Sequence, residues 1–563
     1  MPLNRQQILN WGGQVAAKVP KLRSAFTLGG VSAEADNLLE EAFFQSSDYD
    51  VISSREDPRC FLVGRTGSGK SAALNRLEEQ HPGHVIRINP ENLALPYITN
   101  LQLIKNLDVL DVNLDLFWRA LWKHVFVISI IRHRYHITSQ VTRQNVFRNL
   151  RDRISSDPGK RQALDYLENF EDKFWDETNV LIQRITESFS KRFDDEVAFR
   201  STMPTLGFRL DKKSENETFV ETHRDEVDKF QRIVNDTQLP RLNTMLSVLN
   251  ENILDSEQNF TYIVIDDLDR EWVDERIAND LIRCLFWTVF DLKRIKNLKV
   301  LVALRTNIFK ELDFARRSGG QEDKLRALVL DMKWSHQDLE TMLDDRTAIS
   351  AARAGLSAKC LSELLPNGNA TMGKPVKYII DRTLLRPRDA ITFANECFAV
   401  GLGKNKLAWT DIHAAERDYS MNLLLSLRDE WKGTYPGIDK VVEKFRGSPS
   451  TMTKDELSLR LDEAILLLSD RTFSGVRWLT DVSSEMWAAR PGPIEFHVYQ
   501  PLLEVLFSTG LIGCSTNDPS DSVFYYDDPK FVSRATSLDK TNFFTLHRGF
   551  HSGLEARDPR RNN

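Results

Sequence analysis

The sequence predicts an α/β fold built on a parallel sheet, and three apolar runs of strand length lead to this prediction. They end at Val63, Ile265 and Leu304, and stretches with helical periodicity separate them. A glycine loop follows the first run, two carboxylates follow the second, and an arginine follows the third. Strands alternating with helices are typical of parallel sheets with helices on both faces.

The segment after the first run has a phosphate-binding spacing. Residues 64–71 read G-x-x-x-x-G-K-S, and a helical pattern begins at Ala72. Glycines let backbone N–H groups turn inward around phosphate oxygens, and the helix N-terminus adds its positive dipole end. Lys70 would reach the β- and γ-phosphates, and the Ser71 hydroxyl would coordinate Mg²⁺. The expected nucleotide-binding residues are Gly64, Arg65, Thr66, Gly67, Ser68, Gly69, Lys70, Ser71 and Ala72.

The second and third runs supply the other half of a nucleotide-hydrolysing site. Asp266 would hold Mg²⁺ at the strand tip, and Asp267 would polarise the attacking water. Arg305, after a strand over 298–304, would sense the γ-phosphate, with a surface salt bridge as the alternative. The predicted core is a P-loop NTPase sheet of the additional-strand type. Its catalytic residues would be Lys70, Asp267 and Arg305.

Further segments divide the chain into five regions. Residues 1–50 form a helical lead-in with a helix over 33–44, and the core occupies 51–90 and 259–335, with a fifth strand over 325–334. A large helical insertion covers 91–258, with helices expected over 114–134, 161–193 and 224–254. Its basic cluster is either a solvated helical face or a site for phosphate or nucleic acid. The cluster comprises Arg132, His133, Arg134, His136, Arg143, Arg148, Arg151 and Arg153.

Residues 336–450 form a helical, lid-like domain. Helices are expected over 336–354 and 374–398, the second interrupted at Pro387. Arg386 and Arg388 therefore lie near a turn, from which they could bind the nucleotide phosphates. Pairing with Asp381 or Asp389 is the alternative, and the sequence leaves both open.

Residues 451–563 form a helical region that is winged-helix-like, because helices precede short strands expected over 511–513 and 523–526. Winged helices often bind DNA, but this wing is acidic and would repel phosphates. We therefore favour a packing or lid role. The acidic residues are Asp518, Asp521, Asp527 and Asp528.

Composition describes a globular protein with a net charge of −6. Five scattered cysteines show no pairing or zinc pattern, and the N-terminus carries no apolar signal region. The most apolar segment, 125–131, is too short to span a membrane. The expected location is cytoplasmic, without a membrane partner.

Val264–Arg270, Arg305 and Leu385–Asp389 together resemble bacterial KAP-type P-loop NTPases and the wider STAND class of signalling ATPases. The resemblance implies Mg²⁺-dependent ATP binding and slow hydrolysis, coupled to conformational change or homo-oligomerisation. Several such families serve in anti-phage defence. It implies a molecular switch with a protein effector partner, in which Lys70, Ser71, Asp266, Asp267 and Arg305 hold the roles given above.

Other classes of function compete with this one. An ATP-dependent nucleic-acid-binding regulator would use the basic cluster and the C-terminal region, and makes nucleic acid a further candidate partner. A kinase is disfavoured because paired acids suit water activation. A GTPase is disfavoured because neither 405–408 nor 453–456 completes an N-K-x-D motif.

Overall fold

The computed structural model describes residues 21–89, 114–137, 156–170, 233–268, 275–312, 322–488 and 495–558. The chain divides into two compact units. The sheet unit comprises residues 47–65 and 73–332, and the helical unit comprises residues 1–46, 66–72 and 333–563.

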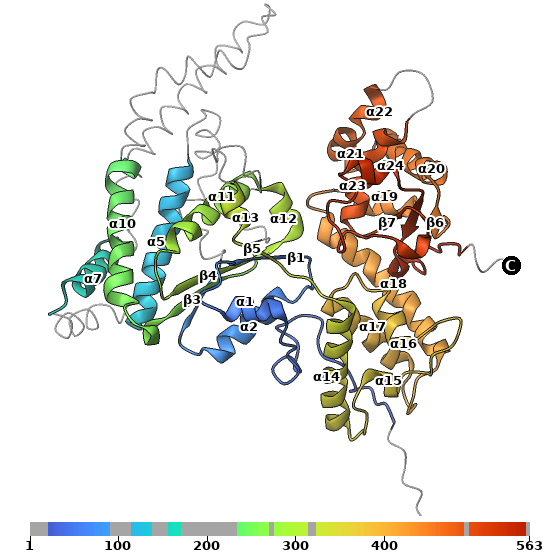
Figure 1. The fold of residues 1–563 in the computed structure, drawn as a ribbon, viewed down its shortest axis with the longest axis horizontal. Coiled ribbons are helices and arrows are strands. Elements are labelled where there is room, and N and C mark those ends of the chain that lie inside the picture. The colour runs from blue at the N-terminus through green and yellow to red at the C-terminus, as the bar shows by residue number, and fades with distance from the viewer. Residues whose placement is uncertain are drawn as a thin grey trace, which may run out of the picture. The chain divides into compact units, whose positions relative to one another are not determined.

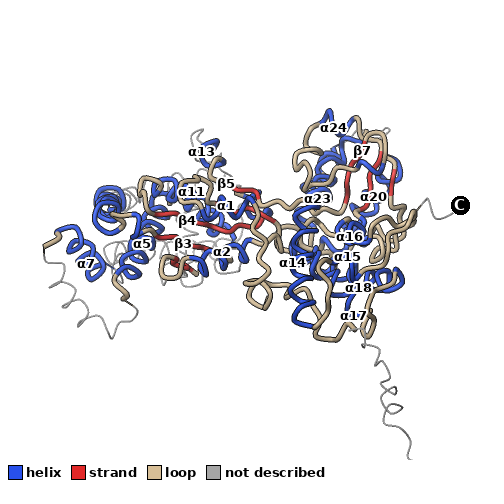
Figure 2. Tube along the Cα trace, turned by 60° about the horizontal axis from the view of Figure 1, so that its bottom comes forward, coloured by secondary structure: helices blue, strands red, loops and turns tan. Residues whose placement is uncertain are grey.

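The sheet unit contains five parallel strands in the order β2-β3-β4-β1-β5 (Figures 1 and 2). Because β4 lies between β1 and β3, the predicted α/β P-loop NTPase sheet with an additional strand is confirmed. The strands are β1 Phe61–Gly64, β2 Val85–Ile88, β3 Thr261–Ile265, β4 Leu298–Arg305 and β5 Val329–Asp331.

Burial separates the central strands of this sheet from its edge strands. Every residue of β1 and β3 is buried, as are seven of the eight in β4, whereas the edge strands β2 and β5 are partly exposed. Central strands of a parallel sheet are covered on both faces and therefore form continuous apolar runs.

Helices cover both faces of the sheet. On one face, the Tyr262 hydroxyl of β3 donates to the Ser53 carbonyl in α1 at 2.5 Å. On the other, Phe61 of β1 stacks on Phe286 of α11 with ring centroids 3.5 Å apart. Figure 1 shows α1 and α2 on one side and α11 and α12 on the other. These helices are α1 Ser47–Ser53, α2 Lys70–Gln80, α11 Glu275–Leu292, α12 Thr306–Glu311 and α13 Glu322–Arg326.

The insertion contributes α5 Asp115–Arg134, α7 Pro158–Phe170 and α10 Leu239–Val248 to the same unit. Helix α5 confirms the expectation for 114–134, and its buried Trp122 indole donates to the Leu281 carbonyl at 2.9 Å. Much of 91–258, including the basic residues at 143–153, lies outside the described residues. Within the described ranges, no helix has the length and apolar character needed to span a bilayer.

The helical unit begins with α14, whose ends carry strong local signals. The Ser335 hydroxyl accepts the Asp338 N–H, completing a capping box, and Gly355 ends the helix with φ +71°. Pro387 stands at the first position of α17, so the expected interruption is confirmed. The helices of this region are α14 His336–Ala354, α15 Leu361–Leu364, α16 Pro375–Ile380, α17 Pro387–Val400, α18 Trp409–Trp431 and α19 Ile438–Glu443.

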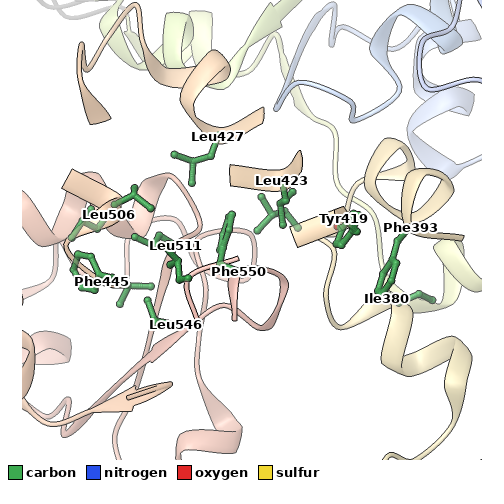
Figure 3. Packing of buried hydrophobic residues seen from close by; sticks show 14 of the residues in the cluster. Ile380, Phe393, Tyr419, Leu423, Leu427, Phe445, Leu506, Leu511, Leu546 and Phe550 are labelled. Atoms are coloured by element: carbon green, nitrogen blue, oxygen red, sulfur yellow. The ribbon is translucent and has the colours of Figure 1, made fainter. Parts of the chain in front are cut away.

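The C-terminal region adds an antiparallel sheet in the order β6-β8-β7, with short helices around it. One hydrophobic core of this unit extends from Leu22 through α14 to the C-terminal region. Figure 3 shows Tyr419, Leu423 and Leu427 of α18 between Phe393 and the residues of the C-terminal region. The elements are β6 Thr451–Met452, α20 Lys454–Ile465, α21 Val476–Val482, α22 Ser484–Ala488, α23 Gln500–Ser508, β7 Ile512–Ser515, α24 Ala535–Asp539 and β8 Phe543–Leu546.

Two predictions of secondary structure in the helical unit were wrong. Residues 33–44 form turns, because Asp36 accepts the N–H groups of Gly30 and Leu38 and pairs with buried Arg346 at 2.8 Å. Residues 523–526 form a turn joined to β7 by a single bridge at Val523, and β8 supplies the neighbouring strand instead.

The prediction of a fifth strand over 325–334 was partly wrong. The segment holds the end of α13 and then a strand of only three residues, β5.

Candidate functional site

The loop after β1 has the backbone of a phosphate cradle. Gly67 and Gly69 adopt φ +83° and +93°, in the left-handed region that side chains rarely enter. A Cβ on Gly67 would also lie 2.8 Å from the Arg388 Cβ. Helix α2 begins at Lys70, so the N-terminal N–H groups of an eleven-residue helix follow directly.

Two hydroxyls in this loop are buried without a hydrogen-bond partner among the described residues. They are Oγ1 of Thr66 and Oγ of Ser68. Burying an unpaired hydroxyl is unfavourable, so such groups in a native fold point to a ligand or water. The glycine cradle and the unpaired hydroxyls both fit a nucleotide phosphate.

The acidic pair lies directly after β3. Asp267 adopts φ +60°, and its backbone N–H donates to the Asp266 Oδ1 at 2.9 Å. Aspartate tolerates the left-handed region better than most residues, and the hydrogen bond orients the Asp266 carboxylate. Carboxylates at a strand tip suit Mg²⁺ binding and water activation.

Strand register places Arg305 at the same edge of the sheet. Gly64, the last residue of β1, pairs with Arg305, the last residue of β4, and Ile265 of β3 pairs with Val302 of β4. The C-terminal ends of the three central strands therefore bring Gly64, Asp266 and Arg305 to one edge, where ligands of open α/β sheets bind.

Two other side chains predicted to bind phosphate have protein partners. The buried Arg386 guanidinium pairs with Asp389 at 2.7 Å and Glu430 at 3.0 Å, and donates to the Thr66 carbonyl at 3.1 Å. Burial opposes the charge, but both carboxylates raise the pKa of Arg386. Arg388 donates from Nε to the Val31 carbonyl at 2.9 Å. Their binding to phosphate stays a prediction.

Sequence reasoning missed two residues that contact the loop. Glu430 accepts the Thr66 N–H at 3.2 Å, and the Trp334 indole donates to the Ser68 carbonyl at 2.9 Å. Both lie hundreds of residues from the loop, and no local spacing signals their partners. No helix was predicted over 409–431, where Glu430 lies, and no role was predicted for Trp334.

Within the described part of the chain, no three His, Cys, Asp or Glu side chains are arranged so that they could hold a metal ion. All five cysteines are free thiols, and burial raises the pKa of Cys60 and Cys514 to about 12. Protonated thiols of this kind are inert.

Comparison with known proteins gives one domain match and one curated relative. Residues 337–428 match the FunZ-associated C-terminal helical domain, a region that covers α14 to α17 and most of α18. The chain is 21% identical over 532 residues to an 80.3 kDa protein ascribed to transposon gamma-delta of Escherichia coli. This match covers 89% of the chain but only 63% of the relative's length.

Two solved structures resemble the chain weakly. One is a Walker-type ATPase of Pyrococcus abyssi, with TM-score 0.34 and 12% identity over 95% of this chain and 97% of that one. The other is the ORC1 protein of Aeropyrum pernix in complex with DNA, with TM-score 0.29 and 11% identity over 90% and 91%. Because both TM-scores are below 0.5, our proposals do not rest on them.

Proposed function

We propose that this protein binds ATP with Mg²⁺ and hydrolyses it slowly, as a molecular switch. The observation that carries the proposal is the loop from Gly64 to Lys70, with two left-handed glycines and two buried, unpaired hydroxyls before a helix N-terminus. A phosphate chain supplies the acceptors that such a loop needs. The acidic pair at the end of β3 supports hydrolysis rather than binding alone.

The residues divide the chemistry among them. Backbone N–H groups of the loop and Lys70 would bind the β- and γ-phosphates, while Ser71 and Asp266 would hold Mg²⁺, which neutralises charge on the phosphate oxygens. Asp267 would accept a proton from the attacking water, and Arg305 would bind the γ-phosphate. ATP is favoured over GTP because the guanine-reading motif is missing from the sequence.

The wider role is part of the same proposal. The chain combines a sheet unit, whose C-terminal edge would hydrolyse the nucleotide, with a large helical unit. This combination suits a switch in which the bound nucleotide sets the conformation of other domains. Resemblance to KAP and STAND ATPases supports a cytoplasmic role in defence or signalling, with homo-oligomerisation and a protein effector.

Lys70→Ala tests the proposal, because the lysine provides the charge that binds the phosphates. We expect Mg²⁺-dependent ATP binding and phosphate release in the full chain, and loss of both in the variant. Lys359→Ala, an exposed lysine in the helical unit, is the matched control and should change neither. Hydrolysis that survives Lys70→Ala would contradict the proposal.

An ATP-dependent nucleic-acid-binding regulator is the second candidate. Helix α5 ends in Arg132, His133 and Arg134, where the basic cluster begins. The Escherichia coli relative is ascribed to a transposon, which also favours a nucleic-acid-binding function for this chain. Gel shifts across a salt series decide, because phosphate contacts weaken steeply with salt. Failure to bind DNA or RNA at low salt would exclude this function.

A further inference from the structure

Thr66, in the middle of the phosphate loop, is held at both of its backbone groups by the helical unit. Its N–H donates to Oε1 of Glu430 at 3.2 Å, and its carbonyl accepts from Nη1 of Arg386 at 3.1 Å. Both partner side chains are only 5% exposed. Water therefore competes poorly for these hydrogen bonds, which fix the peptide planes on either side of Thr66.

Glu430 and Arg386 are themselves fixed by a buried network. Arg386 bridges Glu430 and Asp389, and Asp389 also accepts the Leu384 N–H at 3.2 Å. Leu385, just before Arg386, adopts φ +49°, a conformation that persists only where surrounding contacts impose it. The network thus presents two rigid groups to Thr66.

The same network connects the loop to the rest of the helical unit through α18. Glu430 lies near the end of this helix, one turn after the fully buried Leu427. Figure 3 shows Leu423 beside Phe550 of the C-terminal region, and Leu427 and Leu511 belong to the same buried cluster. Because cores are close-packed, α18 cannot shift relative to that region without moving Glu430 as well.

We infer that Glu430 is a positioning residue of the nucleotide site, which links the conformation of the phosphate loop to the packing of α18. The inference rests on the proposed function. Glu430 acts through the Thr66 backbone and the charge of Arg386, without contacting the nucleotide. Coupling of this kind is reciprocal, so a nucleotide that stabilises the loop also stabilises the end of α18.

Two variants of Glu430 separate its roles. Glu430→Ala removes the acceptor for the Thr66 N–H and one of the two carboxylates that pair with Arg386. We expect about tenfold weaker ATP binding, within the usual range of coupling. Glu430→Gln keeps an amide oxygen for the Thr66 N–H and should recover most of that loss. Asp429→Asn, on the same helix but exposed and paired with the exposed Arg428 and Lys432, is the control and should bind like the native protein.

Hydrogen exchange supplies a readout that simple destabilisation would not change. In the native chain, ATP with Mg²⁺ should slow exchange of backbone amides at 386–390 and 427–431. In Glu430→Ala, ATP at saturating concentration should no longer protect 427–431. If that variant fails to fold, Glu430→Leu, which is closer to glutamate in volume but offers no acceptor, takes its place in the same experiment and should likewise lose the protection of 427–431.

Equal affinity and equal protection in the native chain and in Glu430→Ala, or in Glu430→Leu where it replaces that variant, would overturn the inference while leaving the proposed function intact. Absence of ATP binding in the native chain would instead overturn the proposed function.

Discussion

Gly67→Ala tests the phosphate cradle at the position where the backbone demands glycine most strongly. At φ +83° an alanine side chain costs about 1–2 kcal/mol through its contact with its own backbone. Its Cβ would also meet the Arg388 Cβ at 2.8 Å, and overpacking of this kind adds about 1–3 kcal/mol. The native loop conformation is therefore expected to lose about 2–5 kcal/mol.

The assay compares ATP affinity with stability. If the loop relaxes locally to relieve the strain, binding must restore the cradle, and a cost of about 3 kcal/mol weakens the affinity roughly 100-fold. Gly355→Ala is the matched control, because Gly355 has φ +71° but nothing within 4 Å of its added Cβ. It should lower the free energy of unfolding by about 1 kcal/mol and leave ATP affinity unchanged. If Gly67→Ala bound ATP with native affinity, the proposal that this loop binds the phosphates would be refuted.

Two further predictions concern ion pairs of the helical unit. Arg346→Met leaves the Asp36 carboxylate buried without its ion-pair partner, since both side chains are only 4% exposed. Urea unfolding should show that the free energy of unfolding falls by about 3–5 kcal/mol. Native stability of the variant would contradict the role given to Asp36 in the turns of residues 33–44. Burial alone would raise the pKa of Asp381, but contacts with His336, Lys377 and Arg548 lower it to about 2. Because this pKa lies below the ordinary 3.8, the ionised carboxylate contributes stability above about pH 4 that is lost as pH falls towards 2. Asp381→Asn should lower the free energy of unfolding by about 2 kcal/mol at pH 7. It should also weaken the dependence of that free energy on pH between about 4 and 2, and an unchanged pH dependence in the variant would contradict this prediction.

The sequence could predict the parts of the fold that local patterns encode. The runs ending at Val63, Ile265 and Leu304 are central strands, so burial on both faces made them continuous and visible. Helix α14 carries a capping box and a C-terminal glycine, which define both ends. The exposed edge strand β5 gave no comparable signal, and its short extent was missed.

Long-range contacts account for the other errors. The periodicity of residues 33–44 suggested a helix, but Asp36 satisfies backbone N–H groups of a turn and pairs with Arg346, more than 300 residues away in sequence. The phosphate loop itself was predicted from its G-x-x-x-x-G-K-S spacing between a strand and a helix. Its attachment to Glu430 and Trp334 depends on tertiary packing that no spacing in the sequence reveals.

Titration calorimetry of the full chain with ATP tests the central claim most directly. The account predicts saturable binding that requires Mg²⁺, is lost in Lys70→Ala and persists in Lys359→Ala. Absence of binding in the native chain, or equal binding by Lys70→Ala, would contradict it.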